Sequence, residues 1–354
     1  MRGLMGNASG RADRDDGCGT ECPPSLSPGP ESDDVAGARA VFTIAPGLVI
    51  RAGCCVNDFH TRAFGKWILA GEHAVLRGSP ALAFPLRARG LELRHSANDE
   101  NLRIHTEGLQ NDVLHACAQR ALQRALELLD LGRSAINGTL LIVNRLPCGA
   151  GLGASAALCV ALARWFERLS LVSASAIHEF ARQLENLFHG ESSGLDIAVT
   201  LRECPVVFCS ETGASDFEPA WTPSLFLSDS GARAATTECV DKVKALLRRS
   251  PAEGESIDVD MRNAVNRCVE SLRGKQEAAC GDLAEGINLA ACCFRRWGLV
   301  EPRLAGHMED LMIAGACATK PTGAGIGGYV LSLWNSPPPA LLRDRLIPCF
   351  ASAS

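Results

Sequence analysis

The sequence predicts an α/β protein with two domains. Its 354 residues are enough for two, or at most three, domains of ordinary size. Strand-like apolar runs and segments of helical periodicity alternate along the chain. One such run, Thr139 to Val143, leads through a glycine cluster into the alanine-rich helical segment Ala154 to Glu167. A unit of strand, glycine loop and helix is typical of α/β folds.

Composition excludes several classes of protein. Hydrophobic residues make up 47% of the chain and charged residues 21%, which excludes a chain disordered throughout, a collagen and a coiled-coil rod. The formal net charge of −5 is too small and of the wrong sign for a nucleic-acid-binding surface. We therefore expect a small-molecule substrate and no nucleic-acid partner.

The chain carries no segment typical of membrane insertion or export. A spanning helix needs about 20 apolar residues, and the best run, Ala154 to Ala163, stops at Arg164. The first ten residues lack the apolar core of a secretory signal. We expect a cytoplasmic protein with no membrane partner and with its 16 cysteines reduced. Structural zinc is not expected, because no paired CxxC pattern occurs.

The first residues differ in composition from the rest. Residues 1 to about 40 contain no Lys and are rich in Gly, Pro, Ser and Asp, which is typical of disorder. We expect a disordered leader over residues 1–56. A candidate boundary at Pro219 to Pro223 then divides the remainder into a first domain, 57–222, and a second domain, 223–354.

Local signals predict the elements in order. Residues 63–86 combine small apolar residues with glycines and Pro80, which predicts short buried strands joined by tight turns. Asn111 and Asp112 are candidate N-caps of a helix that ends near Gly132. The other expected helices are from Ser173 or Ser175 to Gly190, Val240 to Leu247, Met261 to Leu272 and Leu304 to Cys317, and the other expected strands are Pro205 to Phe208, Ser224 to Leu227 and Tyr329 to Leu333.

The first glycine cluster, Pro147 to Ser155, stands between a strand and a helix. Its three glycines let the backbone approach a ligand, and the N–H groups at the helix start suit a phosphate. Nucleotide binding is the natural interpretation. A dinucleotide fold would need an acidic residue at the end of a second strand, whereas Glu167 lies in a helical pattern. No Walker A motif occurs, and a glycine turn used only for packing remains the alternative.

A second glycine cluster, Lys320 to Gly328, lies between a helix and a strand. Glycine occupies four of six consecutive positions, 323–328, although each costs up to about 1 kcal/mol relative to alanine. The chain therefore needs a close backbone approach here as well. Two such loops, far apart in the sequence, indicate that two parts of the chain enclose one phosphorylated ligand.

Two acidic residues lie between the glycine clusters. Glu185 falls near a helix end, and a Ser-Ser-Gly turn before Asp196 can return the chain toward it. Two such carboxylates can divide roles, one holding Mg²⁺ and the other contacting a nucleophilic hydroxyl. The alternative is an exposed Glu at a helix end and an Asp that caps a turn.

Together these motifs resemble the GHMP kinase superfamily and, within it, the mevalonate kinase family. The resemblance runs from about Thr61 onward. Residues 63–83, AFGKWILAGEHAVLRGSPALA, are similar to APGKVILFGEHAVVHGxPALA, and residues 147–157, PCGAGLGASAA, to PPGAGLGSSAA. Residues 320–328, KPTGAGIGG, are similar to KLTGAGGGG, and residues 185–199, ENLFHGESSGLDIAV, to ExxxHGxPSGxDNxV. The GEHAVxxGxPALA string separates the chain from galactokinases and homoserine kinases.

The resemblance implies a fold and an activity. The expected fold has an N-terminal ribosomal-S5-domain-2-like domain, a C-terminal ferredoxin-like domain and an active site in the cleft between them. The expected reaction is phosphorylation of the 5-hydroxyl of (R)-mevalonate by ATP with Mg²⁺, a step in isoprenoid precursor synthesis. The alternatives are a GHMP kinase for another small alcohol, such as phosphomevalonate or a sugar, and an inactive ligand-binding relative. A homodimer is left open.

The resemblance also implies residue roles. Lys66 would activate the substrate hydroxyl with Asp196 as its base or charge partner, and Ser155 and Glu185 would hold Mg²⁺. A DTxxxxxT pattern of the family is matched approximately from Asp229 to Thr236. The residues implied for the substrate are Lys66, Glu72, His73, Asp196 and Thr236. Those implied for ATP are Pro147, Gly149, Ala150, Gly151, Leu152, Gly153, Ala154 and Ser155, with Gly323, Ala324 and Gly325 of the second cluster.

Five of the departures from the family's motifs bear on the site. Phe64 replaces a proline, so the fixed φ before Lys66 is lost. Ile326 replaces a glycine, which requires a negative φ there or strain. The other departures are Ala154 for a serine, Ser192 for a proline and Ile197 for an asparagine. None removes an implied catalytic residue, and we expect an active enzyme.

Overall fold

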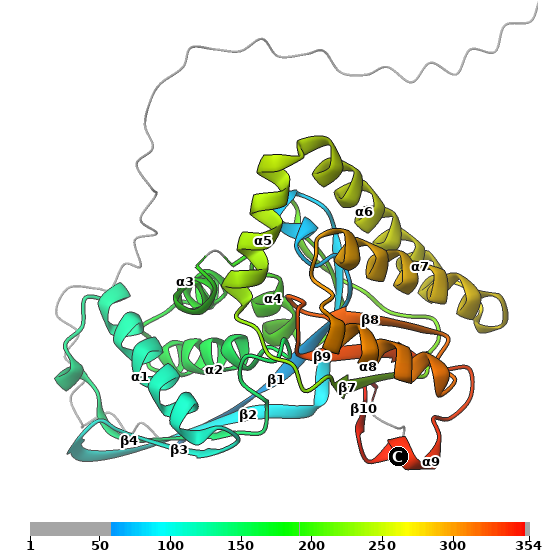
Figure 1. The fold of residues 1–354 in the computed structure, drawn as a ribbon. Coiled ribbons are helices and arrows are strands. Elements are labelled where there is room, and N and C mark those ends of the chain that lie inside the picture. Colours follow the sequence, from blue (N-terminus) through cyan, green and yellow to red (C-terminus); the bar gives the residue numbers. More distant parts are fainter. Residues whose placement is uncertain (1–57, 191, 351–354) are drawn as a thin grey trace, which may run out of the picture. The chain divides into compact units, whose positions relative to one another are not determined.

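The structure is a computed structural model that describes residues 58–190 and 192–350. Within them the chain forms two β-sheets, of six and four strands, with helices packed on both (Figure 1). The predicted α/β class is therefore confirmed. The leader expected over residues 1–56 lies outside the described residues.

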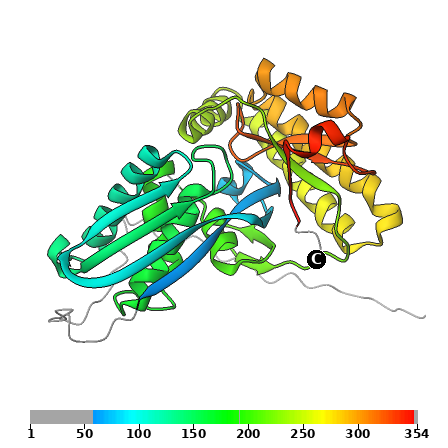
Figure 2. The ribbon, with the colours of Figure 1, turned by 90° about the horizontal axis from the view of Figure 1, so that it is seen from below.

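The first sheet is built from strands between residues 59 and 216. Its strand order is β3-β4-β2-β5-β6, with β1 paired to β2, and all pairs are antiparallel except β3 with β4. Helices cover one face of it (Figures 1 and 2). Its strands are β1 (Phe59–Ala70), β2 (Ala81–Asn101), β3 (Arg103–Gly108), β4 (Asn137–Asn144), β5 (Val206–Cys209) and β6 (Gly213–Asp216), and its helices are α1 (Asn111–Leu128), α2 (Ala154–Arg168), α3 (Ile177–His189) and α4 (Leu195–Arg202).

The second sheet is antiparallel throughout and has the order β10-β7-β9-β8. Helices α6 and α7 lie along each other, and α7 and α8 pack on β8 (Figure 1). The strands are β7 (Leu225–Asp229), β8 (Ala318–Thr322), β9 (Tyr329–Leu333) and β10 (Leu346–Pro348), and the helices are α5 (Thr236–Arg249), α6 (Pro251–Arg273), α7 (Gln276–Arg296), α8 (Pro302–Ile313) and α9 (Ala340–Arg343). Pro219 and Pro223 fall in the segment between the two sheets.

Residues 63–86 differ from the prediction of short strands. They belong to two long strands, β1 of 12 residues and β2 of 21, joined by a loop that contains the short 3-10 helix Ala74–Arg77. Gly65 does not end β1, because a bulge between Phe64 and Gly65 absorbs the irregularity. A Cβ at Gly65 would lie 2.8 Å from the carbonyl oxygen of Leu152, so the glycine permits close packing inside the strand.

Helix boundaries also differ from the expected ones. Helix α1 starts at Asn111 after Gln110, so Asn111 and Asp112 lie in its first turn and do not cap it. Helix α8 ends at Ile313, short of the predicted Cys317, because Gly315 adopts a φ of 107° just after it. The sequence predicts no helix over α7, because the glycines of this segment weaken the apolar pattern. At one of them, Gly286, a Cβ would lie 2.7 Å from Cys268 Sγ, so this glycine lets α6 and α7 approach closely.

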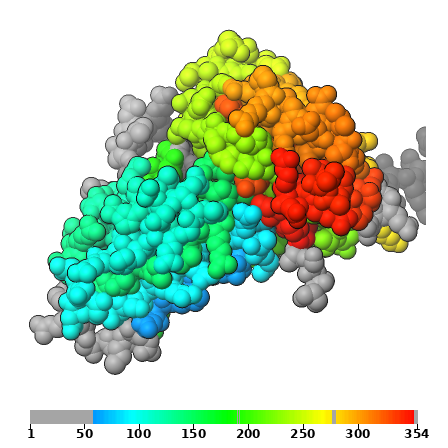
Figure 3. Space-filling model, turned by 60° about the horizontal axis from the view of Figure 1, so that its bottom comes forward, coloured from blue at the N-terminus to red at the C-terminus, as the bar shows by residue number. Residues whose placement is uncertain are grey.

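One hydrophobic core extends under both sheets. Trp67 of β1 stacks on Phe84 of β2 with ring centroids 4.4 Å apart, and Phe350 meets both rings edge-on. Figure 3 shows the surface of the first sheet, in blue and cyan, next to the surface of the C-terminal elements, in yellow-green to red. Among the described residues, every helix is too short or too polar to span a lipid bilayer.

Phe166 tests the packing of helices on the first sheet. Its ring is fully buried between Trp165 and Phe180, at centroid distances of 5.1 and 5.7 Å. Phe166→Ala should lower the free energy of unfolding by about 3–5 kcal/mol, because it removes buried area and leaves a cavity. Urea denaturation measures this. The control Leu341→Ala, at a side chain that is 92% exposed, should change it by less than about 0.5 kcal/mol.

Candidate active site

A cavity of about 410 Å³ lies where loops from both sheets converge. It is bounded by the end of β1, both glycine clusters, the α3–α4 connection and the start of α5. Fifteen of the predicted site residues line it: Lys66, Glu72, His73, Pro147, Gly149, Ala150, Gly151, Gly153, Ala154, Ser155, Glu185, Asp196, Thr236, Gly323 and Ala324. Residues expected to share one ligand are thus brought together from distant parts of the chain.

Leu152 and Gly325 do not line this cavity. Leu152 is fully buried, and its carbonyl oxygen accepts a hydrogen bond from the Lys66 backbone N–H at 3.0 Å. Gly325 packs against Leu299, and its carbonyl accepts from the Cys239 thiol at 3.4 Å. The prediction that both residues contact the nucleotide therefore lacks support from the cavity. The Leu152 side chain lies in the hydrophobic core instead.

The first glycine cluster adopts a conformation that only glycine tolerates well. Gly149, Gly151 and Gly153 have φ values of 66°, 82° and 77°, in the left-handed region. The loop ends at the N-terminus of α2, whose first N–H groups lack helical partners and suit an anion. A Cβ at Gly153 would lie 2.8 Å from Cγ of Lys66, so the glycine also makes room for that side chain.

The two glycine clusters touch each other. A Cβ at Gly323 would lie 2.9 Å from Cα of Gly151, and one at Gly328 would lie 2.8 Å from the carbonyl oxygen of Ala150. Part of the glycine requirement is therefore packing of one loop on the other. The remaining part faces the cavity, since a Cβ at Gly149 would meet no atom within 4 Å.

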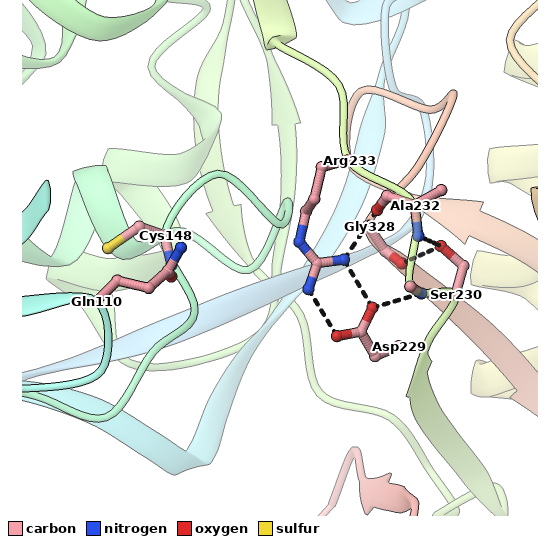
Figure 4. Close-up of polar contacts among 8 residues, drawn as sticks. Gln110, Cys148, Asp229, Ser230, Ala232, Arg233 and Gly328 are labelled. Carbon is pink, nitrogen blue, oxygen red and sulfur yellow. Dashed lines mark hydrogen bonds and ion pairs between the residues drawn. The ribbon is translucent and has the colours of Figure 1, made fainter.

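Hydrogen bonds from the Asp229–Ser230 segment hold the second cluster (Figure 4). Ser230 Oγ donates to the carbonyl of Gly328 at 2.7 Å, and the Gly328 N–H donates to the carbonyl of Ala232 at 2.9 Å. Asp229 binds the guanidinium of Arg233 through both carboxylate oxygens, at 2.7 and 2.6 Å. This segment thus holds the end of the second cluster at Gly328 by hydrogen bonds. It then leads into α5, which begins at Thr236.

The first cluster has its own support from α1. Gln110, which precedes the helix, accepts a hydrogen bond from the backbone N–H of Cys148 through Oε1 at 2.6 Å (Figure 4). Gln110 itself has a φ of 51°. The side chain therefore joins the start of α1 to the residue just before Gly149.

Two departures from the family's motifs have clear local structures. Ile326 has a φ of 62° and is buried, so this β-branched residue is strained, as the sequence analysis allowed. Its N–H donates to the carbonyl of Leu299 at 2.7 Å, which ties down the strained residue. Phe64 remains in the paired strand β1. The guanidinium carbon of Arg62 lies over its ring, 4.8 Å from the ring centroid.

Lys66 and Asp196 form an ion pair at the cavity. Lys66 Nζ lies 2.9 Å from Asp196 Oδ2, with the lysine side chain 3% exposed and the aspartate 24% exposed. Strand β1 carries the lysine, and Asp196 stands in the first turn of α4, where a carboxylate is favoured by the helix dipole. The alternative interpretation was an aspartate that only caps a turn. Asp196 forms an ion pair with Lys66 in addition.

Glu185 is buried at the same cavity. Its side chain, on α3, accepts a hydrogen bond from Ser192 Oγ through Oε2. Its other oxygen, Oε1, has no hydrogen-bond partner among the described residues. Burial, and then the negative charge of Asp196, raise the pKa of Glu185 to about 8. The alternative of an exposed helix-end glutamate is wrong, because the residue is only 1% exposed.

These features fit a divalent cation. A buried carboxylate oxygen without a donor costs free energy that a cation would offset, and Ser155 lines the same cavity. Within the described residues, no group of three or more His, Cys, Asp or Glu side chains is arranged to hold a metal. A cation here would therefore need oxygen atoms from a ligand, as Mg²⁺ commonly takes from nucleotide phosphates.

Glu72 is held by a residue that the sequence analysis did not single out. Lys320 of β8 donates to Glu72 Oε1 at 2.5 Å and to the carbonyl of Ile68 at 3.3 Å. Both partners are buried, which raises the pKa of Glu72 and lowers that of Lys320, while their attraction opposes both shifts. The sequence does hold a signal for this role. Lys320 is a single charged residue among small and apolar residues, at the start of the second glycine cluster, which is typical of a buried lysine with a charged partner.

His73 lies in the loop after β1 and contacts the second glycine cluster. Its Nε2–H donates to the carbonyl of Ala324 at 2.8 Å, and its ring meets those of Phe294 and Trp297 edge-on. Burial lowers the pKa of His73 to about 4. The imidazole is therefore neutral at pH 7 and presents Nδ1 as an acceptor.

Comparison with known proteins shows what the chain is similar to in sequence and fold. The family model of the GHMP kinases N terminal domain matches residues 114–203. A mevalonate kinase of Aeropyrum pernix is 26% identical over 77% of this chain and 87% of its own length, and one of Archaeoglobus fulgidus is 29% identical over 78% and 92%. L. major mevalonate kinase in complex with R-mevalonate has a similar structure, with a TM-score of 0.68 at 21% identity, over 81% of this chain and 89% of its own. This likeness shows the fold and confirms the predicted fold class.

Lys320→Met tests the buried ion pair. The substitution leaves the Glu72 carboxylate buried without a counter-charge, and the free energy of unfolding should fall by about 3–5 kcal/mol. Urea denaturation at pH 7 measures it. The double variant Lys320→Met, Glu72→Gln removes both charges and should be more stable than the single variant. Equal stability of the two would show that the pair is not coupled.

His73→Gln tests the buried imidazole. Because the pKa of His73 falls from 6.5 to about 4 on folding, the unfolded chain binds the proton more tightly. The stability contributed by the neutral ring is present above pH 6.5 and is lost as the pH falls toward 4, by about 3 kcal/mol. The difference in unfolding free energy between wild type and variant should shrink over this range in urea titrations. A constant difference would contradict a depressed pKa.

Proposed function

Because the chain belongs to the GHMP kinase superfamily, we propose that it is a mevalonate kinase, which transfers the terminal phosphoryl group of ATP to the 5-hydroxyl of (R)-mevalonate. The observation that carries the proposal is the Lys66–Asp196 pair, 2.9 Å apart, beside buried Glu185 in one cavity between two glycine loops. The curated relatives with this name extend over most of the chain. The reaction would supply a step of isoprenoid precursor synthesis.

Phosphoryl transfer asks the protein for alignment and charge neutralisation more than for covalent chemistry. Asp196 would orient the substrate hydroxyl and accept its proton at a carboxylate oxygen. Lys66, held in β1 by its backbone hydrogen bond to Leu152, would neutralise the charge that develops on the oxygen and on the transferred group. Backbone N–H groups of the loop 149–155 would hold the phosphates.

Ser155 and Glu185 would hold Mg²⁺. The unpartnered Glu185 Oε1 supports this assignment, and Ser155 stands in the first turn of α2 on the same cavity. When bound, the cation would neutralise charge on the nucleotide phosphates and on the group in transfer.

The substrate would occupy the end of the cavity formed by Glu72, His73 and Thr236, with its hydroxyl toward Lys66 and Asp196. Glu72 Oε2 is buried and has no partner among the described residues, so it can accept a hydrogen bond from a substrate hydroxyl. The neutral ring of His73 can accept one at Nδ1. The domain division at residue 222 and a cytoplasmic location belong to this proposal as well.

A kinase for another small alcohol is the second candidate. A phosphomevalonate kinase of Streptococcus pneumoniae in complex with phosphomevalonate and AMPPNP has a TM-score of 0.62 at 17% identity, over 79% of this chain and 93% of its own. The fold alone therefore does not select the substrate. An inactive ligand-binding relative is disfavoured, since the Lys66–Asp196 pair is formed.

ADP release with Mg-ATP decides between these candidates. We expect turnover with (R)-mevalonate and none above background with 5-phosphomevalonate, homoserine or galactose. Turnover of a different alcohol would transfer the assignment to that substrate. Nucleotide binding without turnover of any of them would support a ligand-binding relative.

Asp196→Asn tests the mechanism. The amide cannot accept the hydroxyl proton, so kcat should fall by roughly 10²–10⁴-fold, while the affinity for ATP, measured by calorimetry, stays within about twofold. Asp282→Asn, at an exposed residue of α7, is the matched control and should keep kcat near wild type. An unchanged kcat in Asp196→Asn would remove this carboxylate from the chemistry.

A further inference from the structure

Ser192 lies in the α3–α4 connection, between the carboxylate assigned to Mg²⁺ and the turn that carries Asp196. We propose that Ser192 is a positioning residue that orients Glu185 for the cation and sets its place relative to the Lys66–Asp196 pair. The inference rests on the proposed function, because it gives Glu185 the role of a magnesium ligand.

Three hydrogen bonds converge on Ser192. Its hydroxyl donates to Glu185 Oε2 and accepts from the backbone N–H of Gly194 at 3.1 Å. Its own backbone N–H donates to Asn186 Oδ1 at 3.0 Å. Ser192 is thus tied to two adjacent residues of α3 and to the residue that precedes α4.

The contact determines which oxygen of Glu185 is available. Oε2 is occupied by the serine hydroxyl, so the carboxylate cannot rotate without losing that hydrogen bond. Oε1 is then the oxygen left without a partner among the described residues, and Glu185 lines the cavity. Hydrogen bonds of this kind to a ligating carboxylate orient it, and their removal typically lowers metal affinity by about 10–100-fold.

The same residue couples the cation position to the reacting pair. Gly194 has a φ of 85° and immediately precedes α4, whose first turn contains Asp196. The hydrogen bond from the Gly194 N–H to Ser192 Oγ links this turn directly to the Glu185 contact. One hydroxyl group therefore joins Glu185 to the turn that places Asp196 2.9 Å from Lys66.

The role is a property of this chain's own sequence. In the motif ExxxHGxPSGxDNxV the corresponding position is a proline, which has neither a hydroxyl nor a backbone N–H. Neither the contact to Glu185 nor the one to Asn186 could form with that residue. Here the serine supplies both.

Binding of Mn²⁺, a paramagnetic substitute for Mg²⁺, tests the inference without turnover. The full chain, saturated with a non-hydrolysable ATP analogue, is titrated with Mn²⁺ while free Mn²⁺ is measured by electron paramagnetic resonance. Ser192→Ala should weaken Mn²⁺ binding by about tenfold, and Ser192→Thr, which keeps the hydroxyl, should restore it to within about twofold. Ser193→Ala is the matched control, because Ser193 Oγ accepts only from the Leu195 N–H at 3.2 Å in the described structure.

The outcomes separate this inference from the proposed function. Wild-type Mn²⁺ affinity in Ser192→Ala, no rescue by threonine, or an equal loss in Ser193→Ala would each overturn the positioning role. Glu185→Gln is titrated in parallel. If it binds Mn²⁺ as wild type does, the metal assignment itself fails. If it loses binding while Ser192→Ala keeps it, only the role of Ser192 is wrong. Thermal unfolding of each variant checks that it is folded.

Discussion

The buried Lys320–Glu72 ion pair is the interaction on which the cavity depends. It joins β8 of the second sheet to the loop that follows β1 of the first. Thr322, two residues further along β8, exchanges hydrogen bonds with the backbone of Ile68 at 3.0 and 3.1 Å. Removing two charges from water is costly unless they compensate each other. Ile68 follows Lys66 by two residues in β1. The hydrogen bonds and the ion pair that connect the two sheets therefore also fix the position of Lys66 at the cavity.

Packing and ligand binding use the same residues in this molecule. The glycines of the two clusters let the loops touch, since Gly323 leaves no room for a Cβ against Gly151. They also bring the start of α2, with Ala154 and Ser155, to the wall of the cavity. A side chain at Gly151 or Gly323 would separate the loops and so disturb both the boundary between the sheets and the cavity. Glycine-rich packing and phosphate binding are therefore a single constraint here.

Local patterns in the sequence predicted the strand, loop and helix at residues 139–168 and the carboxylates Glu185 and Asp196, because each depends on neighbours in the chain. They could not predict that Lys320 pairs with Glu72, a contact between residues 248 positions apart. The hydrogen bond from the Lys66 N–H to the carbonyl of Leu152 is likewise a tertiary contact that local patterns do not reveal. The length of β1 depends on its register with β2, in which a bulge accommodates Gly65. Such features follow from pairing and packing, which a single sequence does not display.

The charges around the cavity indicate why a nucleotide and a cation would bind together. Lys320 compensates Glu72, and Lys66 compensates Asp196. No cation among the described residues is paired with Glu185, and one of its oxygens lacks a donor. The triphosphate of ATP would bring negative charge beside this carboxyl group. A divalent cation between them would attract both. On the proposed assignment, Glu185 thus favours the metal complex of ATP, which is the form that can react.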